Sequence, residues 1–240
     1  AETLADLLVA DLKAGSASLR QQIPSLLQGL VERGTLLQID HEYRLQTRES
    51  ADWEEDFRRR LSAARADDAR LGSERAEAFK KAVGDALRSV SLVQGHSRVA
   101  RKYRLEFGLE MPRVDGESLP VWVQDEWTTS ERAMRDAAQH AGVDSPVVFV
   151  LIPKRDADEL REQMAALLAA TETLNTRPNP TTAEGFEARQ SMDYRKVVAE
   201  GKVKNLVIGL LEKARVMQGG GTEISESGFA AAVRTGLEAS

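Results

Sequence analysis

The stretch that decides the fold is Pro146-Val-Val-Phe-Val-Leu-Ile-Pro153, a short apolar run that is rich in β-branched residues and bounded by prolines. A run of this length and composition is typical of a strand that is buried on both faces, as in a parallel sheet. We therefore expect residues 147–152 to form a central strand and the chain to have a mixed, helix-rich α/β fold.

Two further strands and a helix are predicted upstream of this strand. Apolar and charged residues alternate from Val99 to Phe107, which is the two-residue period of a strand. After a turn at Asp115-Gly116, a second strand is expected over 119–124, and Ser130 is expected to cap a helix that ends near Ala141. A right-handed crossover through this helix makes the strands 119–124 and 147–152 parallel.

Helices are predicted downstream of the central strand. The first is interrupted by the loop Arg177-Pro-Asn-Pro180, and a long helical region follows it. Gly219-Gly220-Gly221 is expected to end the long region, and a short helix closes the chain. The apolar stripes that indicate these helices are Leu160, Met164, Leu167, Leu168 and Leu174 in the first, and Val203, Leu206, Val207, Leu210, Leu211, Ala214 and Met217 in the second.

The first fifty residues follow the order of a winged helix, which is helix, helix-turn-helix and hairpin. Pro24 is expected to separate the second and third helices. The predicted elements are helices over 4–12, 18–23 and 25–33, and a hairpin of 36–39 and 43–45 around the turn Asp40-His41-Glu42.

The segment that follows is charged and rich in alanine, and we interpret it as two helices. Trp53, Phe57 and Leu61 recur every four residues and so share one helical face. A break is expected near Gly72-Ser73. These patterns predict a winged helix over 1–49, a helical connector over 50–96 and an α/β domain with a partly parallel sheet over 97–240.

Composition excludes several classes of protein. The 240 residues carry a net charge of −5, so a globally basic nucleic-acid coat is excluded, although local basic patches are not. Without cysteine there is neither a disulfide nor a thiol nucleophile. No apolar run approaches the length of a membrane span, and no signal peptide precedes Ala1. Because the chain begins Ala-Glu, we expect an internal piece of a longer protein.

Catalytic motifs are missing from the sequence. There is no G-x-x-x-x-G-K-[ST] loop to cradle phosphates and no G-x-S-x-G elbow. The three histidines, His41, His96 and His140, have no neighbouring ligand at a metal-binding spacing. We therefore predict no catalytic, cofactor or metal site and a chain that is not an enzyme by itself.

Asp125 and Lys154 follow two predicted strands and raise the hypothesis of a metal-dependent nuclease. Such enzymes hold Mg²⁺ between close carboxylates, usually with a lysine beside one of them. The residues before Lys154 are Leu151, Ile152 and Pro153, so the second acid is missing. The favoured interpretation is that Asp125 caps the end of its strand or pairs with an arginine.

The candidates for DNA contact lie in two places. Strand alternation puts Arg98, Lys102 and Arg104 on one face, where they could track phosphates. The favoured alternative is an exposed or edge strand whose cations pair with Asp and Glu and discourage aggregation. In the winged helix, Gln28 and Arg33 could read bases from the third helix and Arg44 could reach a phosphate from the wing. Docking of another protein is an equally good interpretation of the winged helix.

Several stretches, in the same order along the chain, resemble the large P-loop, AAA-like ATPase component of BREX phage-defence systems (the BrxC/PglY family). They are Tyr43-Arg-Leu-Gln-Thr-Arg-Glu-Ser-Ala-Asp-Trp53 with Phe57-Arg-Arg-Arg60, Val93-Gln-Gly-His-Ser97, Leu119-Pro-Val-Trp-Val-Gln-Asp125, Ser145-Pro-Val-Val-Phe-Val-Leu-Ile-Pro-Lys154, Glu184-Gly-Phe-Glu-Ala-Arg-Gln-Ser-Met192 and Val216-Met-Gln-Gly-Gly-Gly-Thr-Glu-Ile224.

The resemblance implies a bacterial cytoplasmic defence protein whose ATPase works with other system components on or near DNA. The sequence departs from the family in lacking the phosphate-binding motif, so no ATP-site residue is carried over. We expect a non-catalytic interaction or scaffold module outside the ATPase core, with the rest of the parent ATPase and other defence proteins as partners. The alternative is a non-specific DNA-contacting module, which predicts that the basic strand and Arg33, Arg44, Arg58, Arg59 and Arg60 converge on one surface.

Overall fold

The structure is a computed structural model that describes residues 17–33, 35–39, 42–45, 47–94 and 99–240. It has the predicted helix-rich α/β fold. Its internal contacts form two compact units. The first unit joins the chain up to Ala63 with Leu168–Lys196, and the second joins Ala64–Leu167 with Val197–Ser240. These unit boundaries fall within helices, whereas the domain boundaries predicted from the sequence are at residues 49 and 96. The helix predicted over 4–12 lies outside the described residues.

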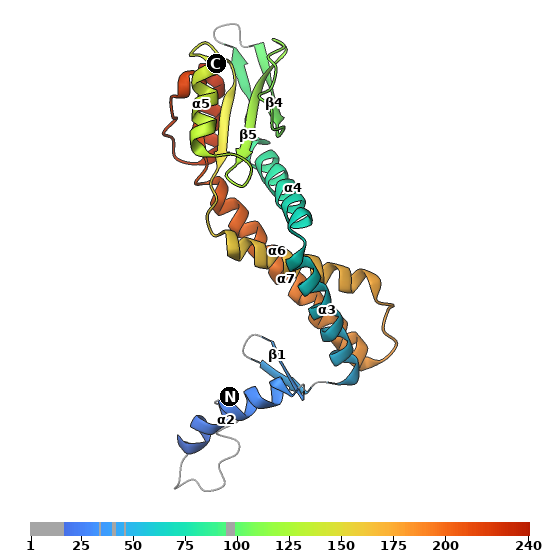
Figure 1. The fold of residues 1–240 in the computed structure, drawn as a ribbon. Helices are drawn as coiled ribbons and strands as arrows, with labels where there is room; N and C mark the ends of the chain where they lie inside the picture. Colours follow the sequence, from blue (N-terminus) through green and yellow to red (C-terminus); the bar gives the residue numbers. More distant parts are fainter. Residues whose placement is uncertain (1–16, 34, 40–41, 46, 95–98) are drawn as a thin grey trace. The chain divides into compact units, whose positions relative to one another are not determined.

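The first unit begins with helix α2 (Ala17–Glu32) and a hairpin of β1 (Leu36–Ile39) and β2 (Glu42–Leu45) (Figure 1). The two strands are antiparallel, with Leu36 opposite Leu45, so the predicted hairpin is confirmed. Ile23 and Leu27 are buried in a small cluster with Leu19, Leu36 and Tyr43.

The prediction of two helices separated at Pro24 is wrong, because α2 runs through Pro24 without a break. A proline inside a helix removes one backbone hydrogen bond and need not end the helix if the apolar face continues beyond it. That face does continue, since Ile23 and Leu27 lie one turn apart. The described residues 17–33 contain no helix-turn-helix, and the winged helix is not confirmed.

Segments of three helices complete the first unit: α3 (Arg48–Ala66), α6 (Ala157–Thr176) and α7 (Ala183–Leu211). The predicted stripe of Trp53, Phe57 and Leu61 is confirmed as the face of α3 that packs. It meets small and medium apolar side chains from the other two helices. The residues that form this cluster with the stripe are Ala169, Ala170, Leu174, Ala188 and Met192.

The break between the two connector helices lies at Asp67 and not at Gly72-Ser73. The carboxylate of Asp67 accepts a hydrogen bond from the backbone N–H of Arg70 (2.9 Å) and caps α4 (Asp68–Leu87). Gly72 lies inside α4, because a single glycine weakens a helix without ending it.

The second unit contains a five-stranded sheet in the order β3-β4-β5-β6-β7. Strands β4, β5 and β6 are parallel, and the outer two are antiparallel to their neighbours. The predicted parallel pairing of 119–124 with 147–152 is confirmed. Strand β6 is interior as predicted, but β5 is the middle strand. The bounds are β3 (Leu92–Gln94), β4 (Val99–Glu106), β5 (Ser118–Asp125), β6 (Val148–Ile152) and β7 (Arg215–Met217).

Helices cover the two faces of this sheet. On one face lies α5 (Glu131–Ala141) (Figure 1). It buries Met134 and Ala138 against Trp122 and Phe149. Ser130 caps α5 as predicted, accepting a hydrogen bond from the N–H of Ala133. On the other face, α8 (Phe229–Ala239) brings Gly236 against Val148.

The prediction that the long helical region continues to the glycine triplet is wrong. Helix α7 ends at Leu211, and Arg215–Met217 form β7, with Met217 opposite Phe149. Met217 fits the helical spacing of the preceding stripe, and a short apolar run is compatible with either structure. Residues 215–217 form a strand and not a further turn of helix, because they pair with the buried strand β6. The triplet Gly219–Gly221 forms a short 3-10 turn after β7.

Candidate functional site

An apolar groove of about 680 Å³ lies in the second unit, bordered by α4, α7 and α8. Its shape follows from the sequence, because the apolar side chains that α4 contributes to it are all alanines, whereas α7 contributes larger valine, isoleucine and leucine side chains. Ile208 is 44% exposed although it belongs to this wall. The apolar lining residues are Ala78, Ala82, Ala86, Leu167, Val203, Val207, Ile208, Leu211, Phe229 and Ala230.

Charged side chains stand among these apolar residues, and both signs are present. Lys81 and Asp85 come from α4, and Glu200 and Lys204 come from α7. Apolar walls with charges of both signs resemble the surfaces that receive an amphipathic helix. Sequence analysis did not single out this groove. Its signal is the run of alanines at 78, 82 and 86, which leaves space beside a helix.

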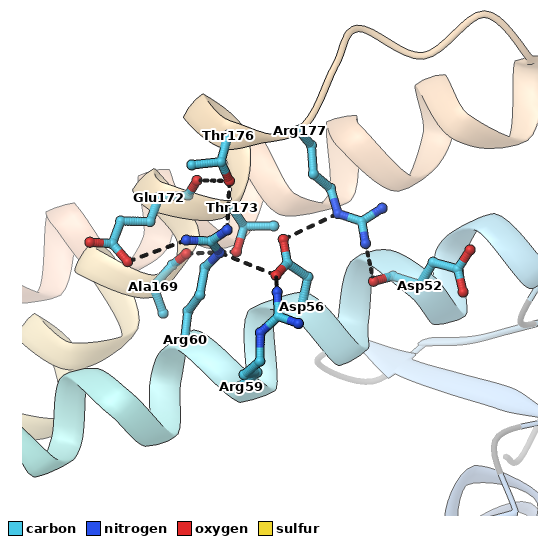
Figure 2. Close-up of polar contacts among 9 residues, drawn as sticks. All are labelled: Asp52, Asp56, Arg59, Arg60, Ala169, Glu172, Thr173, Thr176 and Arg177. Atoms are coloured by element: carbon cyan, nitrogen blue, oxygen red, sulfur yellow. Dashed lines mark hydrogen bonds and ion pairs between the residues drawn. The ribbon is translucent and has the colours of Figure 1, made fainter.

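The charged motif of α3 forms an ion-pair network in the first unit (Figure 2). Asp56 is only 6% exposed, and it pairs with Arg59 and Arg60 on its own helix. Arg177, which follows α6, donates from Nε to Asp56 at 3.3 Å and also donates to the backbone carbonyl of Asp52. Arg60 extends the network to Thr176 (2.8 Å) and Glu172 (3.6 Å).

The environment of Asp56 favours its ionised form. Burial by itself raises the pKa of this carboxyl, but the charges and hydrogen bonds of Arg60, Arg177 and Arg59 outweigh it and hold the pKa below its ordinary value. Glu54 has a similar arrangement, because it pairs with Arg58 at 3.1 Å and with Arg195 of α7 at 3.0 Å. Both acids therefore connect α3 to the helices packed on it.

The DNA hypothesis requires Arg58, Arg59 and Arg60 to converge with other cations on one surface. The ion-pair network gives these three arginines a different role. Each of the three pairs with a carboxylate of the first unit. An arginine that already neutralises a buried acid offers less to a phosphate than an unpaired one does. Among the described residues, Arg60 is the member of the motif that packs inside the unit, whereas the side chains of Arg58 and Arg59 are mostly exposed beside their acids.

Arg104 in the basic strand has a comparable internal role. It pairs with Glu106 (3.0 Å) and Asp115 (3.1 Å), and it donates to the hydroxyl of Ser118 (2.7 Å) and the carbonyl of Arg113. These contacts fasten the loop 107–117, which joins two parallel strands without a helix. Asp115 in turn accepts from the backbone N–H of Glu117, which with Ser118 and Arg104 lowers the pKa of the Asp115 carboxyl.

The other predicted DNA contacts that the structure describes are divided between the two units. Lys102, Gln28 and Arg33 are exposed, and the amide of Gln28 donates to Glu32 at 3.4 Å. Arg98 lies outside the described residues, and so does the side chain of Arg44. Gln28 and Arg33 belong to the first unit and Lys102 and Arg104 to the second.

Asp125 lies at the carboxyl end of β5, as predicted, and caps the turn that follows. Its Oδ1 accepts from the backbone N–H of Trp127 (2.9 Å) and of Thr128 (3.1 Å). The carboxylate next to it, Glu126, accepts from the backbone N–H of Lys154 at 2.7 Å and so joins the ends of β5 and β6. Within the described ranges no group of three or more His, Asp or Glu residues is placed to hold a metal ion.

Comparisons with known proteins add no relative, since no protein-family profile, curated protein or solved structure matches the chain. Among the helices of the described residues, none is both long enough and apolar enough to cross a membrane.

Proposed function

We propose that this chain is a non-catalytic interaction module of a bacterial phage-defence ATPase, outside the ATP-binding core of that protein. The proposal combines the resemblance of its ordered sequence stretches to the BREX ATPase component with the lack of a phosphate-binding loop in the sequence. The partners are then the rest of the parent ATPase and other defence proteins in the cytoplasm.

The observation that carries the proposal is the apolar groove between α4, α7 and α8. Its volume of about 680 Å³ and its wall of alanine, valine and isoleucine suit the apolar face of a partner helix. Burying such a wall is favourable at about 25 cal/mol per Å² of apolar surface. We assign this groove to a helix from the ATP-binding part of the parent protein.

The test is binding of the full 240-residue chain to the purified ATP-binding part of the same parent ATPase, measured by calorimetry. Ala82→Arg places a long charged side chain in the groove and is expected to weaken binding about tenfold or more, since tenfold corresponds to only about 1.4 kcal/mol. Ala76→Arg is the matched control, because Ala76 is an exposed position of the same helix outside the groove. Equal binding by both variants, or no binding by the unchanged chain, would contradict the assignment.

DNA contact is the second candidate, and the exposed side chains of Lys102, Gln28 and Arg33 favour it. Such binding would be non-specific and would weaken by about 0.9 log unit of affinity per log unit of salt for each phosphate neutralised. Anisotropy titrations of duplex DNA at low and moderate salt measure this slope. The interaction-module proposal expects no binding at low salt. Salt-sensitive binding that Lys102→Gln weakens would support the DNA function, and tight binding that survives moderate salt would indicate base reading.

A further inference from the structure

Trp127 lies at the carboxyl ends of the parallel strands β5 and β6, and cationic side chains from two other segments lie near its ring. The guanidinium of Arg75, on α4, lies 4.5 Å from the centroid of the Trp127 ring, and the ammonium of Lys154 lies 5.9 Å from it. Phe79 packs on the same indole with its ring centroid 5.8 Å away. The crevice outside the carboxyl ends of parallel strands is where α/β proteins bind their ligands.

Arg75 has a hydrogen-bonding group without a partner. Its Nε is buried, yet it donates no hydrogen bond within the described part of the chain. Burial lowers the pKa of Arg75, and the negative charge of Asp125 opposes this effect. A buried donor without an acceptor is costly, and few such groups occur in a folded protein. A bound acceptor from a ligand would remove this cost.

The cations open onto a cavity of about 270 Å³. A third cation in its wall, Arg161, is already engaged, because it pairs with Asp68 at 2.5 Å and donates to the carbonyl of Arg65 at 2.6 Å. Arg75 and Lys154 make no ion pair with any residue that the structure describes. The cavity is lined by Asp68, Leu71, Arg75, Trp127, Lys154, Ala157, Asp158, Leu160, Arg161 and Met164.

We propose that this cavity binds a small phosphate monoester, with Arg75 and Lys154 holding the phosphate. An arginine fork and a lysine point charge are the usual protein partners of phosphate oxygens. The cavity is several times larger than a phosphate group, and Leu71, Leu160 and Met164 provide an apolar wall for the organic part of the ester. Asp158 also lines the cavity, and its carboxylate can accept a hydrogen bond from a hydroxyl of the ligand.

This site is independent of the proposed interaction groove. Their lining residues do not overlap, although both use α4. Failure of the partner-binding test would therefore leave the phosphate site standing, and the reverse also holds.

The test is an NMR titration of the full chain with phenyl phosphate, followed at the indole N–H of Trp127 and the backbone amides of 154–164. We expect saturable shifts of these signals with a Kd on the order of 1 mM. Arg75→Gln and Lys154→Gln are each expected to weaken binding about tenfold, the loss of one charge-assisted hydrogen bond. Arg155→Gln is the matched control, because Arg155 is exposed beside Lys154 and does not line the cavity.

Three outcomes would overturn the proposal. The first is the lack of saturable shifts in the unchanged chain, and the second is equal weakening by Arg155→Gln. The third is displacement of phenyl phosphate by a single-stranded oligonucleotide that binds more tightly, which would assign the two cations to nucleic acid. Because Lys154 is exposed, Lys154→Gln keeps the fold even if Arg75→Gln does not, and a thermal melt of each variant separates the two effects.

Discussion

Asp56 stabilises the first unit because three guanidinium groups surround a carboxylate that is almost fully buried. Asp56→Asn leaves Arg60 and Arg177 without their shared partner. We expect it to lower the free energy of unfolding by about 2–4 kcal/mol at pH 7, which is less than the usual cost of about 3–5 kcal/mol for a buried ion pair because the arginine partners are partly exposed. Denaturant unfolding measures this change. Asp52→Asn, an exposed position on the same helix, is the control and is expected to stay within about 0.5 kcal/mol of the unchanged chain.

The same residue predicts how stability depends on pH. The pKa of Asp56 is lowered in the folded chain, so folding favours the ionised form. This contribution is fully present above the ordinary aspartate pKa of about 4 and is lost as the pH falls through the lower folded value. The unfolding free energies of the unchanged chain and of Asp56→Asn are therefore expected to converge below about pH 4. A constant difference down to pH 2 would show that the charge of Asp56 is not the cause.

Arg104 is expected to matter for the loop 107–117 more than for DNA. Arg104→Ala removes its hydrogen bonds to Asp115, Ser118 and the carbonyl of Arg113. We expect a loss of about 1–2 kcal/mol in unfolding free energy and faster tryptic cleavage after Arg113. Lys102→Ala, an exposed position on the same strand, should change neither quantity. Unchanged cleavage in Arg104→Ala would show that the loop is held by other contacts.

At this scale the sequence predicts apolar partners better than ionic ones. The period of Trp53, Phe57 and Leu61 identifies a buried face without knowledge of what covers it. The pairing of Glu54 with Arg58 also follows from their spacing of four residues. The bonds from Arg177 and Arg195 to the same helix span more than a hundred residues, and no local pattern specifies them. Arg75 leaves a weak signal, as a cation on the apolar face of Leu71 and Phe79.

At the scale of elements, the packing of α8 on the sheet depends on a glycine. A Cβ on Gly236 would lie 2.9 Å from Ile224 and 3.1 Å from Val148, so Gly236→Val is expected to cost about 1–3 kcal/mol through overpacking. Gly201 lies inside α7 with nothing within 4 Å of such a Cβ. Gly201→Ala is expected to stabilise the chain by about 0.5–1 kcal/mol, because alanine is the better helix former. Thermal unfolding of both variants checks the opposite signs.

Element boundaries depend on competition between local signals and packing. The break between α3 and α4 lies at Asp67 and not at Gly72, because the Asp67 carboxylate caps a free backbone N–H at the start of α4. A glycine inside a helix only weakens that helix. Pro24 fails to end α2, and pairing with β6 turns 215–217 into a strand. The strands 119–124 and 147–152 and the helix after Ser130 were predicted correctly because pattern, caps and packing agree there.

At the scale of the whole molecule, the proposal that this chain lies outside an ATPase core predicts its response to nucleotide. Without a phosphate-binding loop in the sequence, calorimetric titration of the full chain with Mg·ATP is expected to show no micromolar binding. The ATP-binding part of the parent protein is the positive control. Saturable binding of Mg·ATP at micromolar concentrations would contradict the proposal. Binding of a phosphate monoester in the proposed cavity is expected only near millimolar concentrations, so the two results can be told apart.

The division of the chain into units could not be predicted from sequence. Each unit is built from two separate stretches, and the boundaries fall inside helices whose periodicity continues across them. Composition changes at residues 49 and 96 mark where strands and helices alternate, and they carry no information about which distant helices pack together.

This interleaving has a consequence for synthesis on the ribosome. The indole of Trp53 is covered by residues 169–192, so more than a hundred further residues must be translated before its cover exists. At about 5–20 residues per second, the apolar side of α3 stays uncovered for about 6–28 seconds, and a chaperone can bind it during this time. The second unit must likewise wait for α8, which packs on β6 but follows it far along the chain. Each unit therefore closes only after its later stretch has been translated.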